Sequence, residues 1–158
     1  MGDQPPVRNE QWTPNFWARE FSSRGREFAK GTRSDYQALA VILQRVRDHI
    51  ARPITIVSGQ RLRDHNDAVG GAPDSRHLPP QERANGASGG VAADFRVAGY
   101  STAELHRLYL WLDARASDLG IGGLEFYPKG GFIHVDTRPN RARWPEVSGR
   151  ARYESGAA

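Results

Sequence analysis

The chain has 158 residues, contains no cysteine, and carries a net charge of +4 from 22 basic and 18 acidic residues. Its length fits a single domain, and the lack of cysteine excludes disulfides, a thiol nucleophile and a thiolate metal site. The charge suits an anionic partner such as a cell-wall polymer or a nucleic acid. The basic residues are scattered without a run of five or six, so nucleic-acid binding is not expected.

The two ends of the chain are polar. The N-terminal segment has no apolar core of a secretory signal, and no stretch approaches the roughly 20 apolar residues of a membrane span. We therefore expect a monomer that is made in the cytoplasm without a signal peptide or a membrane segment. Residues 1–14 are expected to form a flexible arm, 15–146 one domain, and 147–158 a frayed tail.

Two amphipathic helices are predicted. The first covers about residues 34–50, and the second follows a capping box in which Ser101 precedes Glu104 by three positions. Each helix carries one apolar stripe at helical spacing, with Leu39, Ile42, Leu43, Val46 and Ile50 on the first and Leu105, Leu108, Leu112, Ala116 and Leu119 on the second.

Four strands and one long loop complete the pattern. The β-branched run at 54–57 predicts a strand, as does 91–97, and strands at 124–127 and 132–137 flank a Pro-Lys-Gly-Gly turn. Residues 58–90 are rich in glycine and proline, and a structureless stretch of this length is usually either functional or disordered. The fold class is therefore α+β, with short elements.

The strand at 132–137 carries a candidate site. Alternation places Ile133 and Val135 on one face, and His134 and Asp136 together on the other. Since isoleucine and valine belong in the core, the histidine and the carboxylate share the opposite face. Such a pair suits a metal or a proton-transfer site, although a solvated pair on an exposed sheet face would give the same pattern.

Two further residues are candidate ligands. His77 lies in the long loop, and Asp94 lies in the middle of a strand among small apolar residues, where a carboxylate is costly to bury unless it is paired or metal-bound. A structural Asp–Arg pair would also explain Asp94. His49 and His106 fall at a helix end and on a polar helix face, so we expect both at the surface.

Several separated motifs occur in a recognisable order between about residues 15 and 144. They are Ser58-Gly59-Gln60-Arg61, His65-Asn66, Val69-Gly70-Gly71-Ala72, Ser75-Arg76-His77, Gly90-x-Ala92-x-Asp94, Phe132-Ile133-His134-Val135-Asp136 and Arg141-Ala142-Arg143-Trp144. Together they resemble the M15 peptidases, the zinc D-alanyl-D-alanine carboxypeptidases and murein endopeptidases. The resemblance implies a hedgehog/DD-peptidase-like domain with a small antiparallel sheet and helices packed on one side.

The resemblance also implies site residues. His77, Asp94 and His134 would bind Zn²⁺ and leave one position open for water, which zinc activates. Arg61 would bind a substrate carboxylate or stabilise the oxyanion, and Ser75 would bind substrate or orient His77. An ordinary Arg–Asp pair is the alternative for Arg61.

The chain departs from the family pattern in two places. About ten extra residues, 79–88, lie between Leu78 and Gly89, where they could form a lip over the site or displace His77. The position three residues before His134, where many members have the catalytic carboxylate, is Gly131. Asp136 and Glu125 are therefore the candidate general bases, with Asp136 favoured.

These observations predict a zinc metallopeptidase that hydrolyses peptidoglycan stems or cross-links by attack of zinc-bound water. A D,D-bond is favoured over an L-alanyl-D-glutamate bond. The chain resembles a compact phage or prophage lysin, which acts on the cell wall if it is released, and a cytoplasmic muropeptide-recycling enzyme is also compatible. The alternative is a zinc-containing wall-binding or structural domain of the same fold without catalysis.

Overall fold

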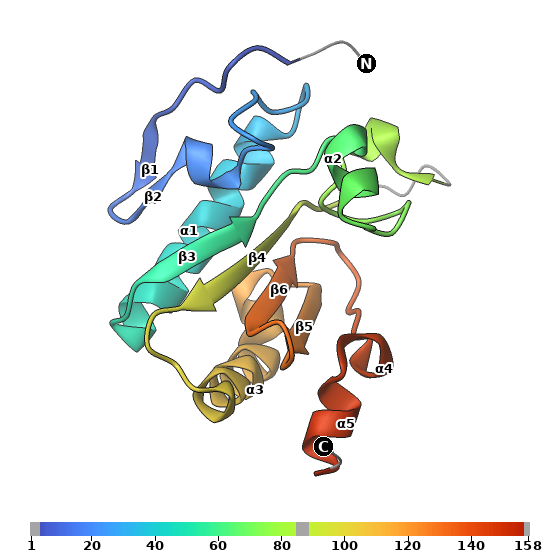
Figure 1. Ribbon diagram of the computed structural model, residues 1–158. Helices are drawn as coiled ribbons and strands as arrows, with labels where there is room; N and C mark the ends of the chain where they lie inside the picture. The colour runs from blue at the N-terminus through green and yellow to red at the C-terminus, as the bar shows by residue number, and fades with distance from the viewer. Residues whose placement is uncertain (1–3, 85–88, 157–158) are drawn as a thin grey trace.

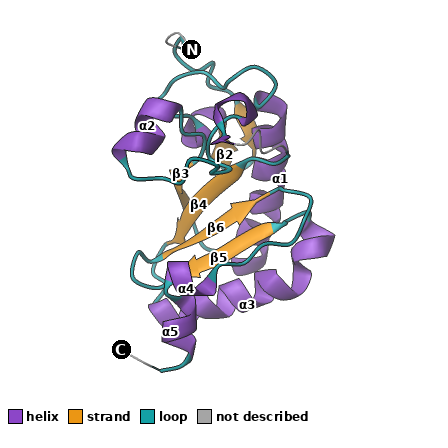
Figure 2. Ribbon diagram, turned by 90° about the vertical axis from the view of Figure 1, so that its right-hand side faces the viewer, coloured by secondary structure: helices purple, strands orange, loops and turns teal. Residues whose placement is uncertain are grey.

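The computed structural model describes residues 4–84 and 89–156 and contains a four-stranded antiparallel sheet of order β3-β4-β6-β5. Helices α1 (Arg33–Ile50) and α3 (Thr102–Leu119) cover one face of this sheet (Figures 1 and 2). The predicted α+β class, with helices on one side of a small antiparallel sheet, is confirmed. The strands are β3 (Ile54–Ser58), β4 (Ala92–Val97), β5 (Gly123–Tyr127) and β6 (Phe132–Asp136).

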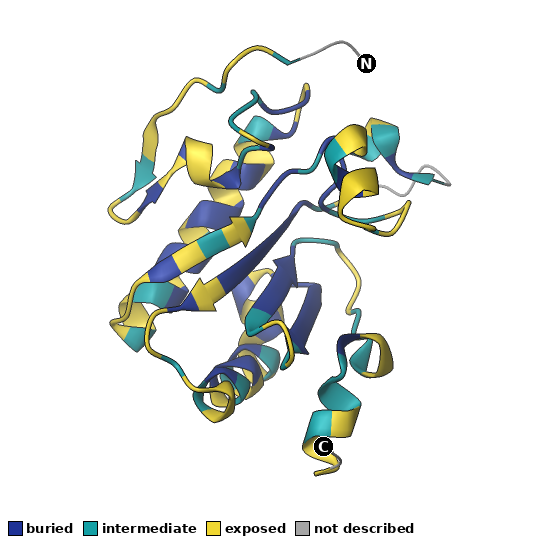
Figure 3. Cartoon of the chain, viewed as in Figure 1, coloured by how far each residue is buried: buried dark blue, intermediate teal, exposed yellow. Residues whose placement is uncertain are grey.

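The core lies between the sheet and the two long helices. Burial runs along the strands and along the helix surfaces that face them (Figure 3). Removing these apolar side chains from water is the main force that holds the layers together. The capping box that begins α3 is confirmed, since Ser101 Oγ accepts from the Glu104 N–H at 3.1 Å. Core members include Leu39, Leu43, Val46, Leu105, Leu108, Leu112, Phe95, Phe126, Ile133 and Val135.

Strand register places polar residues in one row on the uncovered face. Asp94 on β4 lies directly opposite His134 on β6, which lies directly opposite Glu125 on β5. Their neighbours Ile133 and Val135 are fully buried in the core. The predicted alternation along β6 is therefore confirmed, and the row gathers three polar side chains opposite the helices.

Short helices occur in addition to the two long helices that the sequence predicted. The loop expected at 58–90 contains α2, whose C-terminal turn is fixed by buried Asn66, because the side-chain amide donates to the Gly71 and Ala72 carbonyls. None of the helices in the described part of the chain has the length and apolar character needed to cross a membrane. The short helices are η1 (Ala18–Phe21), α2 (Arg63–Ala68), η2 (Pro80–Glu82), α4 (Pro145–Ser148) and α5 (Arg150–Glu154).

Both ends contain structure in place of the predicted arm and tail. Strand β1 (Gln11–Thr13) pairs with β2 (Phe16–Trp17), and the ring of Trp12 lies 5.5 Å from that of Phe28. At the other end, Arg150 of α5 donates to buried Glu125 at 2.5 Å. Aromatic packing and a long-range ion pair therefore fix segments that local composition describes as polar.

Candidate metal centre

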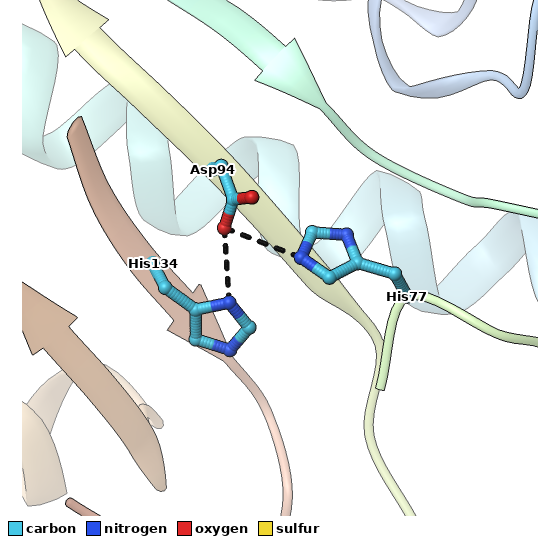
Figure 4. A group of neighbouring side chains, drawn as sticks. All are labelled: His77, Asp94 and His134. Carbon is cyan, nitrogen blue, oxygen red and sulfur yellow. Dashed lines mark hydrogen bonds and ion pairs between the residues drawn. The ribbon is translucent and has the colours of Figure 1, made fainter. Parts of the chain in front are cut away.

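Three side chains converge on the uncovered sheet face. His77 Nε2 lies 3.2 Å from Asp94 Oδ1, and His134 Nδ1 lies 2.9 Å from the same oxygen (Figure 4). The ligand atoms of all three residues lie within 4.8 Å of one another. Two ligands of one tetrahedral zinc ion, each at its usual bond length, are about 3.3 Å apart, so the spacing suits a zinc-sized ion. The structure brings together all three ligands predicted from the sequence.

His77 is positioned by backbone contacts. Its carbonyl accepts from the Arg61 N–H at 2.7 Å, and its N–H donates to Ser75 Oγ at 3.2 Å. Its Nδ1 lies 2.7 Å from the Gly59 carbonyl oxygen. Gly59 has no room for a side chain, because a Cβ there would lie 2.3 Å from the Phe21 carbonyl oxygen. The backbone that follows β3 therefore fixes the His77 ring through its Nδ1 atom, on the side away from Asp94.

The protonation pattern of the two rings favours a cation between them. Because the Gly59 carbonyl can only accept, Nδ1 of His77 carries the hydrogen and Nε2 presents its lone pair to Asp94. In the same way, Nε2 of His134 donates to Asp136 at 2.7 Å, and Nδ1 presents a lone pair to Asp94. Two neutral rings and one carboxylate then direct only acceptors at one another, which is unfavourable unless a metal ion or added protons lie there.

The charges of the cluster are strongly perturbed. Burial lowers the pKa of His134, but the hydrogen bonds that its charged ring donates to Asp136 and Asp94 outweigh burial and raise that pKa to about 9. Burial holds the pKa of His77 below its usual value. Burial also acts to raise the pKa of Asp94, yet His77 and His134 outweigh it and lower the pKa well below its usual range. Without metal, His134 is therefore doubly protonated and positively charged at neutral pH.

Asp136, a predicted base, is buried behind His134. Its carboxylate accepts from Arg138 Nε at 2.7 Å and Nη2 at 2.6 Å, in addition to His134. A Cβ at Gly123 would lie 2.0 Å from Asp136 Oδ2, so the side chain occupies space that the glycine leaves open. Asp136 is fully buried and does not line the pocket. These contacts favour a role in orienting His134.

Glu125, the other predicted base, faces the same side as His134 but is also fully buried. Its Oε1 accepts from Arg150 Nε at 2.5 Å, and its Oε2 accepts from the Trp144 N–H at 2.7 Å. The carboxylate therefore anchors the chain after β6, which local sequence could not reveal because the partners lie 19 and 25 residues away.

A pocket of about 590 Å³ opens over the cluster. Arg61 lines it with a buried Nε that has no partner in the described part of the chain, and its Nη2 lies 3.4 Å from Ser75 Oγ. Outside the cluster, Asp74 is the carboxylate among the described lining residues. The sequence analysis did not single out the lining residues Tyr127, Arg138 and Val147, whereas Phe132 and Trp144 each lie in one of the motifs.

The extra segment does not displace His77. Arg83 turns its guanidinium inward, where it donates to the Leu78 carbonyl at 2.9 Å and the Gly90 carbonyl at 2.6 Å. These bonds tie the segment to the chain on both of its sides. The predicted lip comprises residues 79–88, and its last four residues, 85–88, lie outside the described residues.

Known proteins resemble the chain in sequence. The family model of M15 peptidases matches residues 14–136. The peptidoglycan L,D-endopeptidases MepK of Escherichia coli K12 and of Shigella flexneri are each 28% identical over 95 residues, which are 57% of this chain and 43% of the relative. The chain thus spans less than half the length of these curated relatives. No solved structure matches it significantly.

Proposed function

The chain belongs to the M15 peptidase family, and from this premise we propose that it is a zinc peptidase acting on bacterial peptidoglycan. The carrying observation is the convergence of His77 Nε2, His134 Nδ1 and Asp94 Oδ1, whose hydrogen-bonding pattern suits a cation. With two histidines and one carboxylate, the donor set is the type used by catalytic zinc sites with three protein ligands.

Zinc would supply Lewis acidity, which lowers the pKa of a water molecule and polarises the carbonyl of a peptide. Around that ion, Asp136 would fix the His134 ring through Nε2, and the Gly59 carbonyl would fix His77 through Nδ1. In the neutral rings these partners take the hydrogen of the far nitrogen, so the nitrogens that face Asp94 can bind a metal once His134 has lost its extra proton.

Arg61 and Ser75 would bind substrate beside the metal. Arg61 lines the pocket, and its planar guanidinium can form a forked contact with a carboxylate, or bind a carbonyl oxygen, of the peptide. Ser75 accepts from the His77 N–H and from Arg61, and so links the substrate contact to the metal ligand.

For the general base we propose Asp74, and not Asp136 or Glu125, which the sequence suggested. Asp136 and Glu125 are both fully buried in ion pairs with arginines. Asp74 lines the pocket, is exposed and has no ion pair among the described residues, so we assign it the role of accepting the proton of the attacking water.

The bond that we propose is an L,D-bond in a peptide stem or cross-link. The MepK relatives are L,D-endopeptidases by name, and this weighs against the D,D-bond favoured by the sequence motifs. The D,D-carboxypeptidase or endopeptidase activity stays as the second candidate for the same site.

The test is mass spectrometry of purified peptidoglycan after incubation with the zinc-loaded protein. Chelator-treated protein and the His134→Ala variant serve as controls. A fragment that appears only with the zinc-loaded wild type supports a metallopeptidase, and its mass identifies the bond. If zinc is bound stoichiometrically and walls of several chemotypes stay intact, the proposal is wrong and a non-catalytic wall-binding domain is favoured.

A further inference from the structure

One hydroxyl on the pocket wall has no role in the scheme above. Tyr127 ends strand β5 and lines the pocket, and its ring stacks on Phe132 with centroids 4.6 Å apart and planes at 13°. Trp144 donates from Nε1 to the Tyr127 hydroxyl oxygen at 2.6 Å. Contacts on two sides therefore hold the phenol in one orientation.

The strand register places Tyr127 on the metal-binding face. Glu125 lies directly opposite His134, and Tyr127, two residues further along β5, shares that face. Diagonal neighbours on adjacent strands are about 7–8 Å apart, within reach of an aromatic side chain and a small ligand between them. Arg61 and Asp94 are close enough that their charges act on the Tyr127 phenol.

The hydroxyl is available as a donor. A tyrosine hydroxyl has one hydrogen to donate and an oxygen that accepts, and here the oxygen accepts from Trp144. Within residues 4–84 and 89–156, no other hydrogen bond involves this hydroxyl. Burial raises the pKa of Tyr127, more than Trp144 lowers it, so the phenol keeps its hydrogen at neutral pH. That hydrogen has no acceptor among the described residues, and the Tyr127 side chain borders the pocket.

Trp144 is itself held firmly. Its N–H donates to Glu125 Oε2 at 2.7 Å, and Glu125 is neutralised by Arg150 of α5. The indole meets the His134 ring edge-on, with centroids 5.1 Å apart. The buried Glu125–Arg150 pair therefore fixes Trp144, and Trp144 fixes the tyrosine. Trp144 and Arg150 lie beyond residues 14–136, which the family model matches.

We propose that Tyr127 is a catalytic residue whose hydroxyl donates a hydrogen bond to the carbonyl oxygen of the scissile peptide as negative charge develops there, with Trp144 as its positioning residue. This inference rests on the proposed peptidase function. A preorganised donor aimed at the developing charge stabilises the transition state more than the ground state, so its loss lowers kcat.

The experiment measures kcat and KM of the zinc-loaded full chain on cross-linked muropeptides prepared from purified peptidoglycan. Tyr127→Phe should lower kcat by about 100-fold, with KM within about threefold of wild type, because the lost donor acts in the transition state. Trp144→Phe, which keeps a ring but removes the indole N–H, should lower kcat less. Tyr153→Phe, a tyrosine of α5 outside the pocket lining, should match wild type.

Zinc content and the thermal midpoint are measured on every variant. A Tyr127→Phe protein with wild-type kcat overturns the inference and leaves the peptidase proposal standing. A lowered kcat that excess zinc restores would show that the tyrosine only supports metal binding, which also overturns it. Absence of cleavage by the wild type overturns the proposed function and this inference together.

Discussion

His134 and Asp136 lie two residues apart on β6, and their side chains meet, with Nε2 2.7 Å from Oδ2. Arg138 holds the same carboxylate through two nitrogens, and Gly123 leaves the space in which it lies. The carboxylate is thus fixed from several sides and fixes the ring in turn. This arrangement directs Nδ1 of His134, rather than Nε2, toward Asp94 and the candidate metal site.

The first prediction concerns Asp136→Asn. Loss of the negative charge weakens the hold on His134 and its tautomer, so zinc affinity should fall roughly 10- to 100-fold. Competition with a chelating dye measures this affinity. Asp113→Asn is the matched control, because Asp113 also pairs with two arginines, Arg141 and Arg143, but lies outside the pocket lining. Unchanged zinc affinity with abolished turnover would instead identify Asp136 as the base, and unchanged turnover in Asp74→Asn would agree.

The second prediction tests the ligand set. His77→Ala, Asp94→Ala and His134→Ala should each reduce zinc below one ion per chain, because each removes one of three protein ligands. Elemental analysis of the purified proteins gives the ratio. His106→Ala should keep full zinc, since His106 pairs with Glu154 away from the cluster. Full zinc content in His77→Ala would show that another residue takes its place.

Sequence pattern predicted the three clustered residues, and it named Ser75 and Asp136, but it did not predict most of the contacts that hold them. The motifs predicted His77, Asp94 and His134, and alternation in β6 predicted the face of His134. Strand register depends on tertiary structure, so the sequence alone did not predict that Glu125 lies opposite His134. The sequence suggested Glu125 and Asp136 as bases because it does not show that Arg150 and Arg138 form ion pairs with them.

Local composition also misled at the loop and the ends. The glycine-rich segment was expected to be a long loop, either functional or disordered, yet it contains a short helix, and one buried amide, Asn66, fixes its turn by bonds to two carbonyls. The C-terminal segment read as frayed, yet Arg150 reaches a carboxylate 25 residues earlier. Such long-range partners leave no periodic signal in the sequence.

The third prediction concerns this C-terminal pair. Arg150→Met leaves Glu125 buried without its counter-ion, which should lower the free energy of unfolding by about 3–5 kcal/mol. Urea titration followed by circular dichroism measures the change. Arg141→Met breaks an exposed pair and should cost at most about 1 kcal/mol. A similarly small loss in Arg150→Met would restore the frayed-tail interpretation of residues 147–158.

The fourth prediction concerns Arg61→Lys. Lysine keeps the positive charge but lacks the planar fork that binds a carboxylate, so KM should rise about tenfold while kcat changes less. Steady-state assays on muropeptides measure both, with zinc content as a check on the metal site. Arg96→Lys is the control, because Arg96 is exposed and, among the described residues, its side chain donates only to the Gly130 carbonyl. A selective loss of kcat would favour the oxyanion role for Arg61.

The fifth prediction follows from the raised pKa of His134, about 9 in the metal-free protein against about 6.5 in an unfolded chain. A raised folded-state pKa gives stability that is fully present below pH 6.5 and is lost as pH rises through 9. The thermal midpoint of the chelated protein should therefore fall across this window. His134→Gln should show no such fall, because the titrating ring is absent.

The zinc-loaded protein should behave differently in the same window. Metal binding requires the unprotonated ring, so raising the pH removes the competing proton and strengthens binding. Its thermal midpoint should hold steady or rise between pH 6.5 and 9, and the two curves should diverge. Parallel curves for the chelated and loaded proteins would mean that metal and proton do not compete at His134, and that the metal lies elsewhere.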